Sequence, residues 1–227
     1  MSDLFGFDLA DGLASGECPV CFALRRHTRR WLDSFWREGR QAPATRKRFY
    51  AAGGFCRAHA WLLHDLVGDS GAAIADVYGR LAEHDLASIG ELLAGRRVRR
   101  RPPARSLRRR ASCSVCAEEI EALPRKAEFF LELIATEAGR ARYEHAAGLC
   151  YEHLLSVLDA AGDGHELGAY LLADWRRRLE ELRRRLAEYD RTRDHRYAAE
   201  RRDDERSWTD VVRHYVGSPP QSTERPG

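Results

Sequence analysis

Apolar residues recur at three- and four-residue steps along most of the 227-residue chain. This spacing gives a helix one apolar face, whereas no segment shows the alternation of apolar and polar residues that is typical of a strand. The first such helix follows residue 21 and ends at the stretch 39–43, which contains Gly39 and Pro43. Further helices are expected over 45–52, from about residue 56, and over a long segment that carries Ile74 and Leu81. The pattern predicts an all-α fold.

The second half of the chain repeats this order of elements. Its first helix contains Pro124, which we expect to break or kink it, and its last helix spans about 166–190. The stretch RKRFYAAGGFC also matches RARYEHAAGLC. This match places Arg46, Arg48, Phe49 and Gly54 opposite Arg140, Arg142, Tyr143 and Gly148.

All six cysteines fall in two copies of one motif. The copies read Cys18-x2-Cys21-x34-Cys56-x2-His59 and Cys113-x2-Cys116-x33-Cys150-x2-His153, with offsets of 95 and 94 residues. Such regularity indicates a duplicated unit of about 80 residues. We therefore divide the chain into a leader (1–17), a first repeat (18–95), an Arg-rich linker (96–112), a second repeat (113–190) and a tail (191–227) with a short helix.

Each CxxC and CxxH pair lies near the start of a predicted helix, so its two side chains share one helix face. The helix dipole there favours thiolate over thiol. Three sulfurs and one imidazole are the ligand set of a closed tetrahedral zinc site. We predict a helical bundle of two pseudo-repeats that holds two zinc ions. Each ion is expected to use ligands of one repeat only, because closing the shorter loop costs slightly less entropy.

Several alternatives were compared with structural zinc. An iron–sulfur cluster on the same ligands stays open, because ligand identity alone does not separate it from zinc. Cysteines that act only as small buried side chains, or as a thioredoxin-like dithiol, explain the paired CxxH less well. Covalent haem is excluded, because Phe22 and Ala117 stand where the haem histidine is needed. A catalytic zinc is disfavoured, because four protein ligands leave no position for water.

The sequence gives no positive sign of catalysis, since it has no nucleotide-binding, nucleophile-elbow or HExxH motif. We therefore favour a protein that is not an enzyme. None of the remaining histidines completes a ligand spacing. His64 and His84 are weak candidates to support the first site.

Composition and charge indicate the class of protein and its cellular compartment. The chain is 44% hydrophobic, as in globular proteins, and lacks both a membrane-spanning apolar run and a signal peptide, so we expect a cytoplasmic protein. Its net charge is only +3, and 36 of its 38 basic residues are arginine, which suggests a GC-rich genome. The stretch RRVRRRPPARSLRRR (96–110) contains nine arginines. We interpret it as a solvated connector and regard nucleic-acid binding as the weaker interpretation.

The motifs CPVC, GFCRAHAW and GLCYEH, together with the tail RDHRYAAERRDDERSWTDVVRHYVG, resemble an uncharacterised bacterial family of unknown function that is common in actinobacteria. That family's tail signature corresponds here to Asp194-His195-Arg196-Tyr197 and Ser207-Trp208, with RRDDER in place of an acidic glycine turn. The resemblance implies a cytoplasmic, all-helical protein with two Cys/His clusters and supplies no activity.

Two functional hypotheses follow. The first is a non-enzymatic binding or regulatory protein whose zinc sites organise short helices and whose exposed surface meets a protein partner. The second is a redox or metal sensor that uses iron–sulfur clusters or labile Cys3His zinc.

Overall fold

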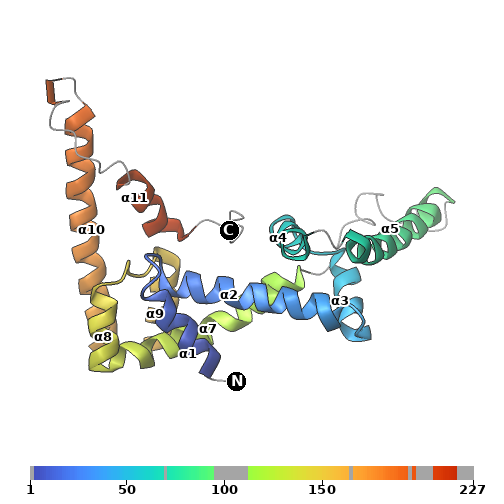
Figure 1. Cartoon of the computed structure of the whole chain (residues 1–227), viewed down its shortest axis with the longest axis horizontal. Coiled ribbons are helices and arrows are strands. Elements are labelled where there is room, and N and C mark those ends of the chain that lie inside the picture. The colour runs from blue at the N-terminus through green and yellow to red at the C-terminus, as the bar shows by residue number, and fades with distance from the viewer. Residues whose placement is uncertain are drawn as a thin grey trace. The chain divides into compact units, whose positions relative to one another are not determined.

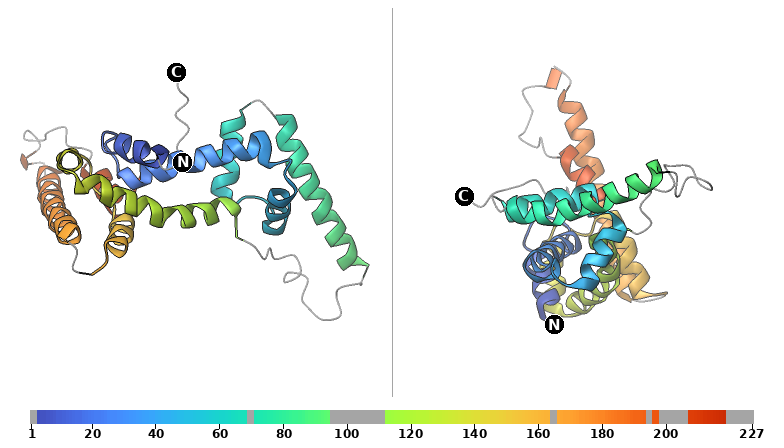
Figure 2. Two further views of the ribbon diagram at one scale, coloured as in Figure 1. Left: turned by 90° about the horizontal axis from the view of Figure 1, so that it is seen from below. Right: turned by 90° about the vertical axis from the view of Figure 1, so that its right-hand side faces the viewer.

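A computed structural model describes residues 3–68, 71–94, 112–163, 166–193, 196–197 and 207–218. Within them every regular element is helical, and Figures 1 and 2 show coiled ribbons without an arrow. The predicted all-α fold is confirmed for this part of the chain. The Arg-rich stretch 96–110 and the tail residues 194–195 lie outside it, so the predictions made for them stay predictions.

The described residues form two compact units that do not follow the repeat boundaries. The first unit draws on residues 1–26 and 121–219, and the second chiefly on residues 27–120. Each unit therefore combines most of one repeat with the CxxC segment of the other. The boundary falls inside two helices, α2 (Pro19–Ser34) and α7 (Ser114–Ala135).

The first unit contains the start of α2, most of α7, and five further helices. These are α1 (Asp3–Gly12), α8 (Glu137–Glu144), α9 (Tyr151–Ala161), α10 (Glu166–Arg193) and α11 (Ser207–Val216). Helices α9, α10 and α11 contact one another (Figure 1). The core includes the fully buried side chains Leu9, Val20, Phe130, Leu149 and Leu171.

Helix α1 was not expected from the sequence, which suggested only a leader there. Gly6 and Gly12 weaken the helical signal of this segment. Leu9 of this helix and Leu13, which directly follows it, are nevertheless buried in the first unit's core, 0% and 5% exposed. Burial against the rest of the unit thus outweighs the poor intrinsic propensity.

The second unit contains the end of α2, a π-helical turn η1 (Phe35–Gly39), α3 (Pro43–Ala52), α4 (Arg57–Val67), α5 (Gly71–Leu93) and the start of α7. Its core is aromatic, with the Phe35 and Phe49 rings each within 5.0 Å of Phe55. Helix α3 begins with Pro43, as the fixed φ of proline favours. Helix α7 continues through Pro124, so the expected break does not occur.

Glycines at equivalent positions turn the chain into each CxxH helix. Gly54 has φ +88° and Gly148 has φ +84°, a region that residues with a Cβ rarely adopt. A Cβ on Gly148 would also lie 2.8 Å from the Arg178 side chain. The guanidinium of Arg178 donates to Asp174 and to the carbonyls of Tyr143 and Ala146. It is therefore not free to move away.

We expect Gly148→Ala to destabilise the protein by about 1–3 kcal/mol, because strain at φ and the contact with Arg178 act together. The midpoint of thermal or urea unfolding measures this. Gly79→Ala is the control, because Gly79 lies inside α5, where an added methyl group would have no atom within 4 Å, and the change should stabilise by about 0.5–1 kcal/mol. Equal effects of the two changes would contradict the argument.

Candidate metal centres

The first group of candidate ligands, centre 1, lies in the first unit and consists of Cys18, Cys21, Cys150 and His153. Cys18 directly precedes α2 and Cys21 lies in its first turn, while Cys150 is the N-cap of α9 and His153 lies in its first turn. Their ligand atoms are all within 4.8 Å of one another. Three of the four side chains are buried, and Cys21 is partly buried.

The second group, centre 2, lies in the second unit and consists of Cys56, His59, Cys113 and Cys116. Its construction is the same. Cys56 is the N-cap of α4, Cys113 directly precedes α7, and the other two residues lie one turn further along these helices. The eight residues proposed as ligands from the sequence are thus gathered into two groups of four that could each hold a metal ion.

The prediction that each group uses ligands of one repeat is wrong. Centre 1 combines the CxxC pair of the first repeat with the CxxH pair of the second, and centre 2 does the reverse. The expectation that each ion uses ligands of one repeat therefore fails, because each group of four takes one pair from each repeat.

Apolar burial explains the exchange. Val20, between the cysteines of the first CxxC, is fully buried in the same core cluster as Leu149 and Leu154 of the second repeat. Val115 is likewise fully buried in the core of the second unit. Burying one such side chain stabilises by about 1.5–3 kcal/mol, whereas doubling a loop costs only about 0.6 kcal/mol. The small difference in loop-closure entropy does not decide the pairing.

The distances within each group match ligands of a single tetrahedral ion. Two sulfurs at about 2.3 Å from such an ion are about 3.8 Å apart. The Sγ atoms of Cys21 and Cys150 are 3.8 Å apart, and those of Cys56 and Cys116 are 3.7 Å apart. In both groups the histidine turns Nδ1 toward the sulfurs, at 3.2–3.4 Å in centre 1 and 3.3–3.6 Å in centre 2.

Two helix N-termini converge at each group, as the sequence predicted. The carbonyl oxygens of Cys18, Cys56, Cys113 and Cys150 each accept the first backbone hydrogen bond of their helix, at 2.8–3.0 Å. The partial positive charge of two helix N-termini therefore acts on the sulfurs of each group. This field stabilises thiolates and so favours metal binding.

Proton affinities within the metal-free groups reflect close packing of thiols and imidazoles. Burial opposes a charge on His59 and on His153, but hydrogen bonds to cysteines outweigh it and raise the pKa of each to about 10. Burial likewise opposes the Cys113 thiolate, yet the hydrogen bond with His59 and backbone N–H groups lower its pKa to about 6. The cysteines beside each histidine thus favour its protonated form, and a metal ion that binds Nδ1 must displace that proton.

Centre 2 has a supporting carboxylate. The other ring nitrogen of His59, Nε2, lies 3.2 Å from Glu119 Oε1, and the buried Thr28 hydroxyl donates to the same oxygen at 2.6 Å. Burial works against the charge of Glu119, but these hydrogen bonds lower its pKa. A carboxylate in this position orients a ligating histidine and fixes its tautomer. At the matching place in centre 1, three residues after Cys21, stands Leu24.

Sequence reasoning missed Glu119, although its helical spacing from Cys116 places both on one face of α7. It had suggested His64 and His84 as supporting residues. Both are exposed, and they pair with the neighbouring Asp65 and Asp85 instead.

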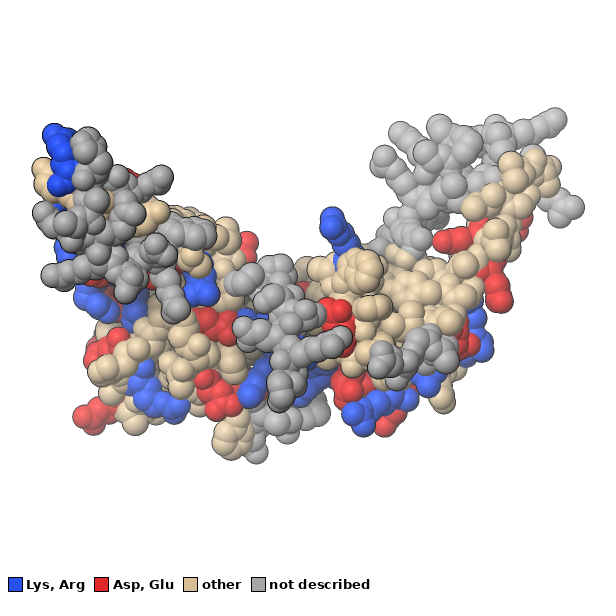
Figure 3. All heavy atoms as spheres, turned by 45° about the horizontal axis from the view of Figure 1, so that its top comes forward, with Lys and Arg blue, Asp and Glu red and all other residues tan. Residues whose placement is uncertain are grey.

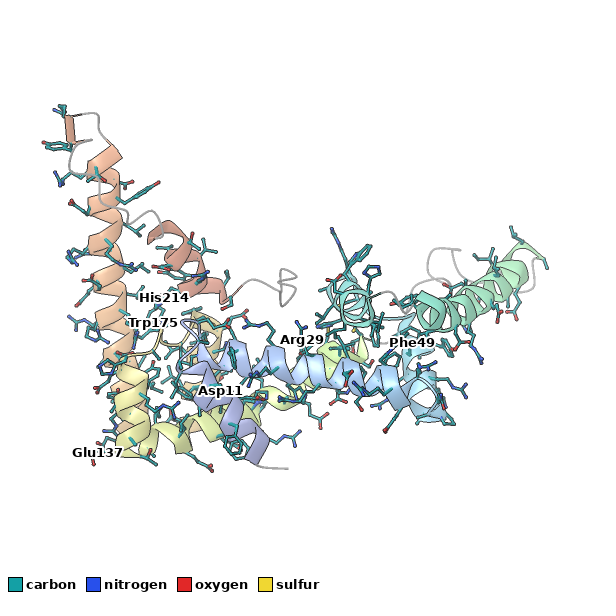
Figure 4. All side chains as sticks on the ribbon, in the orientation of Figure 1. Asp11, Arg29, Phe49, Glu137, Trp175 and His214 are labelled. Carbon is teal, nitrogen blue, oxygen red and sulfur yellow. The ribbon has the colours of Figure 1, made fainter. Side chains whose placement is uncertain are left out.

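Centre 1 is covered by the chain after α11. Gly217, with φ +78°, is so close that a Cβ would lie 2.7 Å from Cys21 Sγ and 3.4 Å from Cys150 Sγ. Next to it, His214 of α11 stacks on Trp175 of α10 at 4.8 Å (Figure 4). Cys18 and Cys150 also line a cavity of about 430 Å³ beside this segment. The CxxC and CxxH motifs do not indicate that Gly217 lies beside centre 1.

No family model matches the chain, and no curated protein or solved structure matches it either. The resemblance to the actinobacterial family therefore stays a prediction. Among the described helices, none has the length and apolar character that crossing a membrane requires.

Two double variants test the exchanged pairing. Removing Cys18 and Cys150 should abolish one centre and leave about one ion per chain, because both belong to the same group. Removing Cys18 and Cys56 should leave almost none, because they belong to different groups. Elemental analysis of Cys→Ser proteins after desalting measures the ratio. The reverse result would restore the assignment of one centre to each repeat.

Glu119→Gln should weaken zinc binding at one of the two centres about 10–100-fold, the usual effect of removing a carboxylate that supports a ligating histidine. Competition with a zinc-sensitive dye measures the two affinities. The exposed Glu121, two residues further along α7, supplies the control Glu121→Gln. Unchanged affinities in both variants would show that the contact with His59 does not tune the centre.

Proposed function

We propose that the protein is a non-enzymatic, metal-binding helical module that carries two structural zinc ions and acts as a binding or regulatory protein in the cytoplasm. The observation that supports this most is that each centre gathers four protein ligands at the ends of two helices. Four such ligands complete a tetrahedral shell and leave no position for a reacting water, which is the arrangement of structural zinc.

The spacing of the sulfurs favours one ion over an iron–sulfur cluster. A cluster distributes its thiolates over different iron atoms, which moves their sulfurs further apart than ligands of one ion. Separations of 3.7 and 3.8 Å between sulfurs agree with the single ion. Three thiolates and one imidazole are soft ligands that suit zinc. All six cysteines are free of disulfides, as expected in a reducing cytoplasm.

A role in binding a protein partner is supported by apolar side chains on the surface. Trp61 on α4 is 62% exposed, and Leu86 and Leu93 on α5 are 67% and 84% exposed. Exposed tryptophan is enriched at protein interfaces. On the face drawn in Figure 3, acidic and basic residues are interspersed over both units. This mixture of charges gives no further support to nucleic-acid binding, for which the Arg-rich linker is weak evidence.

The alternative is a sensor with a labile zinc ion at centre 1. One observation favours it: Cys18 and Cys150, although buried, are among the residues that line a cavity of about 430 Å³, which offers a small oxidant or chelator a route toward centre 1. Zinc-bound thiolates that a reagent can reach are open to oxidation. The two proposals differ in what happens to the fold when this ion is lost.

The deciding experiment removes the metal from protein purified without oxygen. If both ions are structural, stepwise chelation should lower helicity and the melting temperature as each ion leaves, since structural zinc contributes on the order of 10–16 kcal/mol of apparent binding free energy. Elemental analysis and the absorption spectrum of the starting material identify zinc or iron.

Each other outcome has a distinct meaning. Loss of the first ion without loss of helicity or stability would favour the sensor. A brown protein that contains iron and sulfide would contradict zinc at both centres. As a control, manganese, which prefers oxygen ligands, should not restore the fold of the chelated protein, whereas zinc should.

A further inference from the structure

A second kind of site lies in the second unit, apart from the cysteines. It is a cavity of about 360 Å³ where η1, α3 and α5 meet, a volume typical of small-molecule sites. Figure 4 labels one of its wall residues, Phe49. Its lining consists of Phe35, Arg40, Gln41, Arg46, Phe49, Tyr50, Asp76, Val77 and Arg80.

The lining carries an excess of positive charge. It contains three arginines and one carboxylate, that of Asp76, which accepts a hydrogen bond from Arg80 at 3.0 Å. Neither Arg40 nor Arg46 forms an ion pair with a carboxylate among the described residues. Arg40 uses its Nε to donate to the carbonyl of Trp36, which leaves its two terminal amino groups for another acceptor. Two guanidiniums at one cavity are suited to a carboxylate or phosphate.

Aromatic side chains also line this cavity. Phe35 and Phe49 are 3% and 2% exposed, and their ring centroids are 5.7 Å apart. Tyr50 packs edge-to-face against Phe49 at 5.6 Å. A ligand with a planar apolar part next to its anionic group would therefore match both sides of the cavity.

The backbone at the cavity is itself unusual. Phe35–Gly39 is a π-helical turn, and the N–H of Arg40 donates to the carbonyl of Phe35 at 2.8 Å, five residues back. Such turns are rare and are found often at functional sites. An inserted residue rotates the following side chains by about 100° around the helix axis. Phe35 and Arg40, at the two ends of this turn, both line the cavity.

The second repeat lacks this arrangement. With the 94-residue offset of the CxxH motifs, Arg46 corresponds to Arg140 and Asp76 to Tyr170. There the guanidinium of Arg140 lies over the Tyr170 ring, 5.1 Å from its centroid. Helices α7 and α8 are joined through the N-cap Thr136, without a π-helical turn. The residues that line the cavity are therefore not reproduced at these positions of the second repeat.

We propose that this cavity binds a small organic anion, with its carboxylate or phosphate held by Arg40 and Arg46 and its planar apolar part against Phe35, Phe49 and Tyr50. This assignment goes beyond the zinc-binding module, because it gives the protein a small-molecule ligand. It does not depend on which metal the Cys/His centres hold.

Calorimetric titration of the full-length, metal-loaded protein tests the site with phenyl phosphate, benzoate, inorganic phosphate and phenol as probes. At least one of the first two should bind, and more tightly than both phosphate and phenol, because only these two match the charged and the apolar sides together. The stronger of the two identifies the anionic group. No binding of either at about 10 mM would overturn the proposal, since two charge-assisted hydrogen bonds should give a measurable affinity.

Matched variants locate the binding. Arg46→Gln should weaken it about tenfold or more, whereas Arg140→Gln, at the equivalent position of the second repeat, should leave it unchanged. Asp76→Tyr, which copies the second repeat, should fill the cavity and abolish binding. Helicity and metal content show that each variant is folded, and Arg40→Gln replaces Arg46→Gln if the latter is not. Equal weakening by Arg46→Gln and Arg140→Gln, or binding that survives Asp76→Tyr, would overturn the proposal.

Discussion

The convergence of two helix N-termini on one group of three sulfurs and an imidazole is the contact on which the described structure depends. In centre 1 the partners that meet are 129–135 residues apart along the chain, and in centre 2 they are 54–60 apart. Thiolates packed this closely repel one another unless a cation lies between them. The helix ends reduce that repulsion, and a metal ion bound by all four ligands would remove it.

The exchange of ligand pairs makes each compact unit a product of both repeats. Val20 and Val115, carried by the two CxxC segments, are fully buried in cores formed mainly by the other repeat. The grouping of the candidate ligands and the apolar burial therefore agree on the same pairing, in which each centre uses one pair from each repeat. This agreement between local chemistry and core packing is typical of sequences that specify one structure.

The two centres have the same kinds of candidate ligand at the same helix starts, but different residues surround them. Centre 2 has the Thr28 and Glu119 contacts to its histidine, whereas Gly217 covers centre 1. Arg46 borders a cavity in the first repeat, while its counterpart Arg140 lies over an aromatic ring. The four candidate ligands of each centre are of the same kinds, whereas the residues around them differ. The differences are therefore where a specific function of each half is to be sought.

The sequence by itself determined what depends on local spacing. Apolar residues at three- and four-residue steps predicted the helices. The CxxC and CxxH patterns predicted eight candidate ligands at helix starts, and Cys56 and Cys150 occupy the N-cap positions of α4 and α9. Helix α1 was not predicted, because two glycines weaken its propensity, and burial of Leu9 and of the following Leu13 stabilises this segment.

Only the tertiary structure decided which ligand pairs meet. The two copies present chemically equivalent pairs, so their motifs cannot distinguish a pairing within a repeat from one between repeats. The difference in loop-closure entropy between these pairings is small. The choice was made by the burial of side chains such as Val20 against residues more than a hundred positions away, including Leu149. Gly217 beside Cys21 and the cavity at η1 were decided in the same way, by contacts between segments that no local pattern connects.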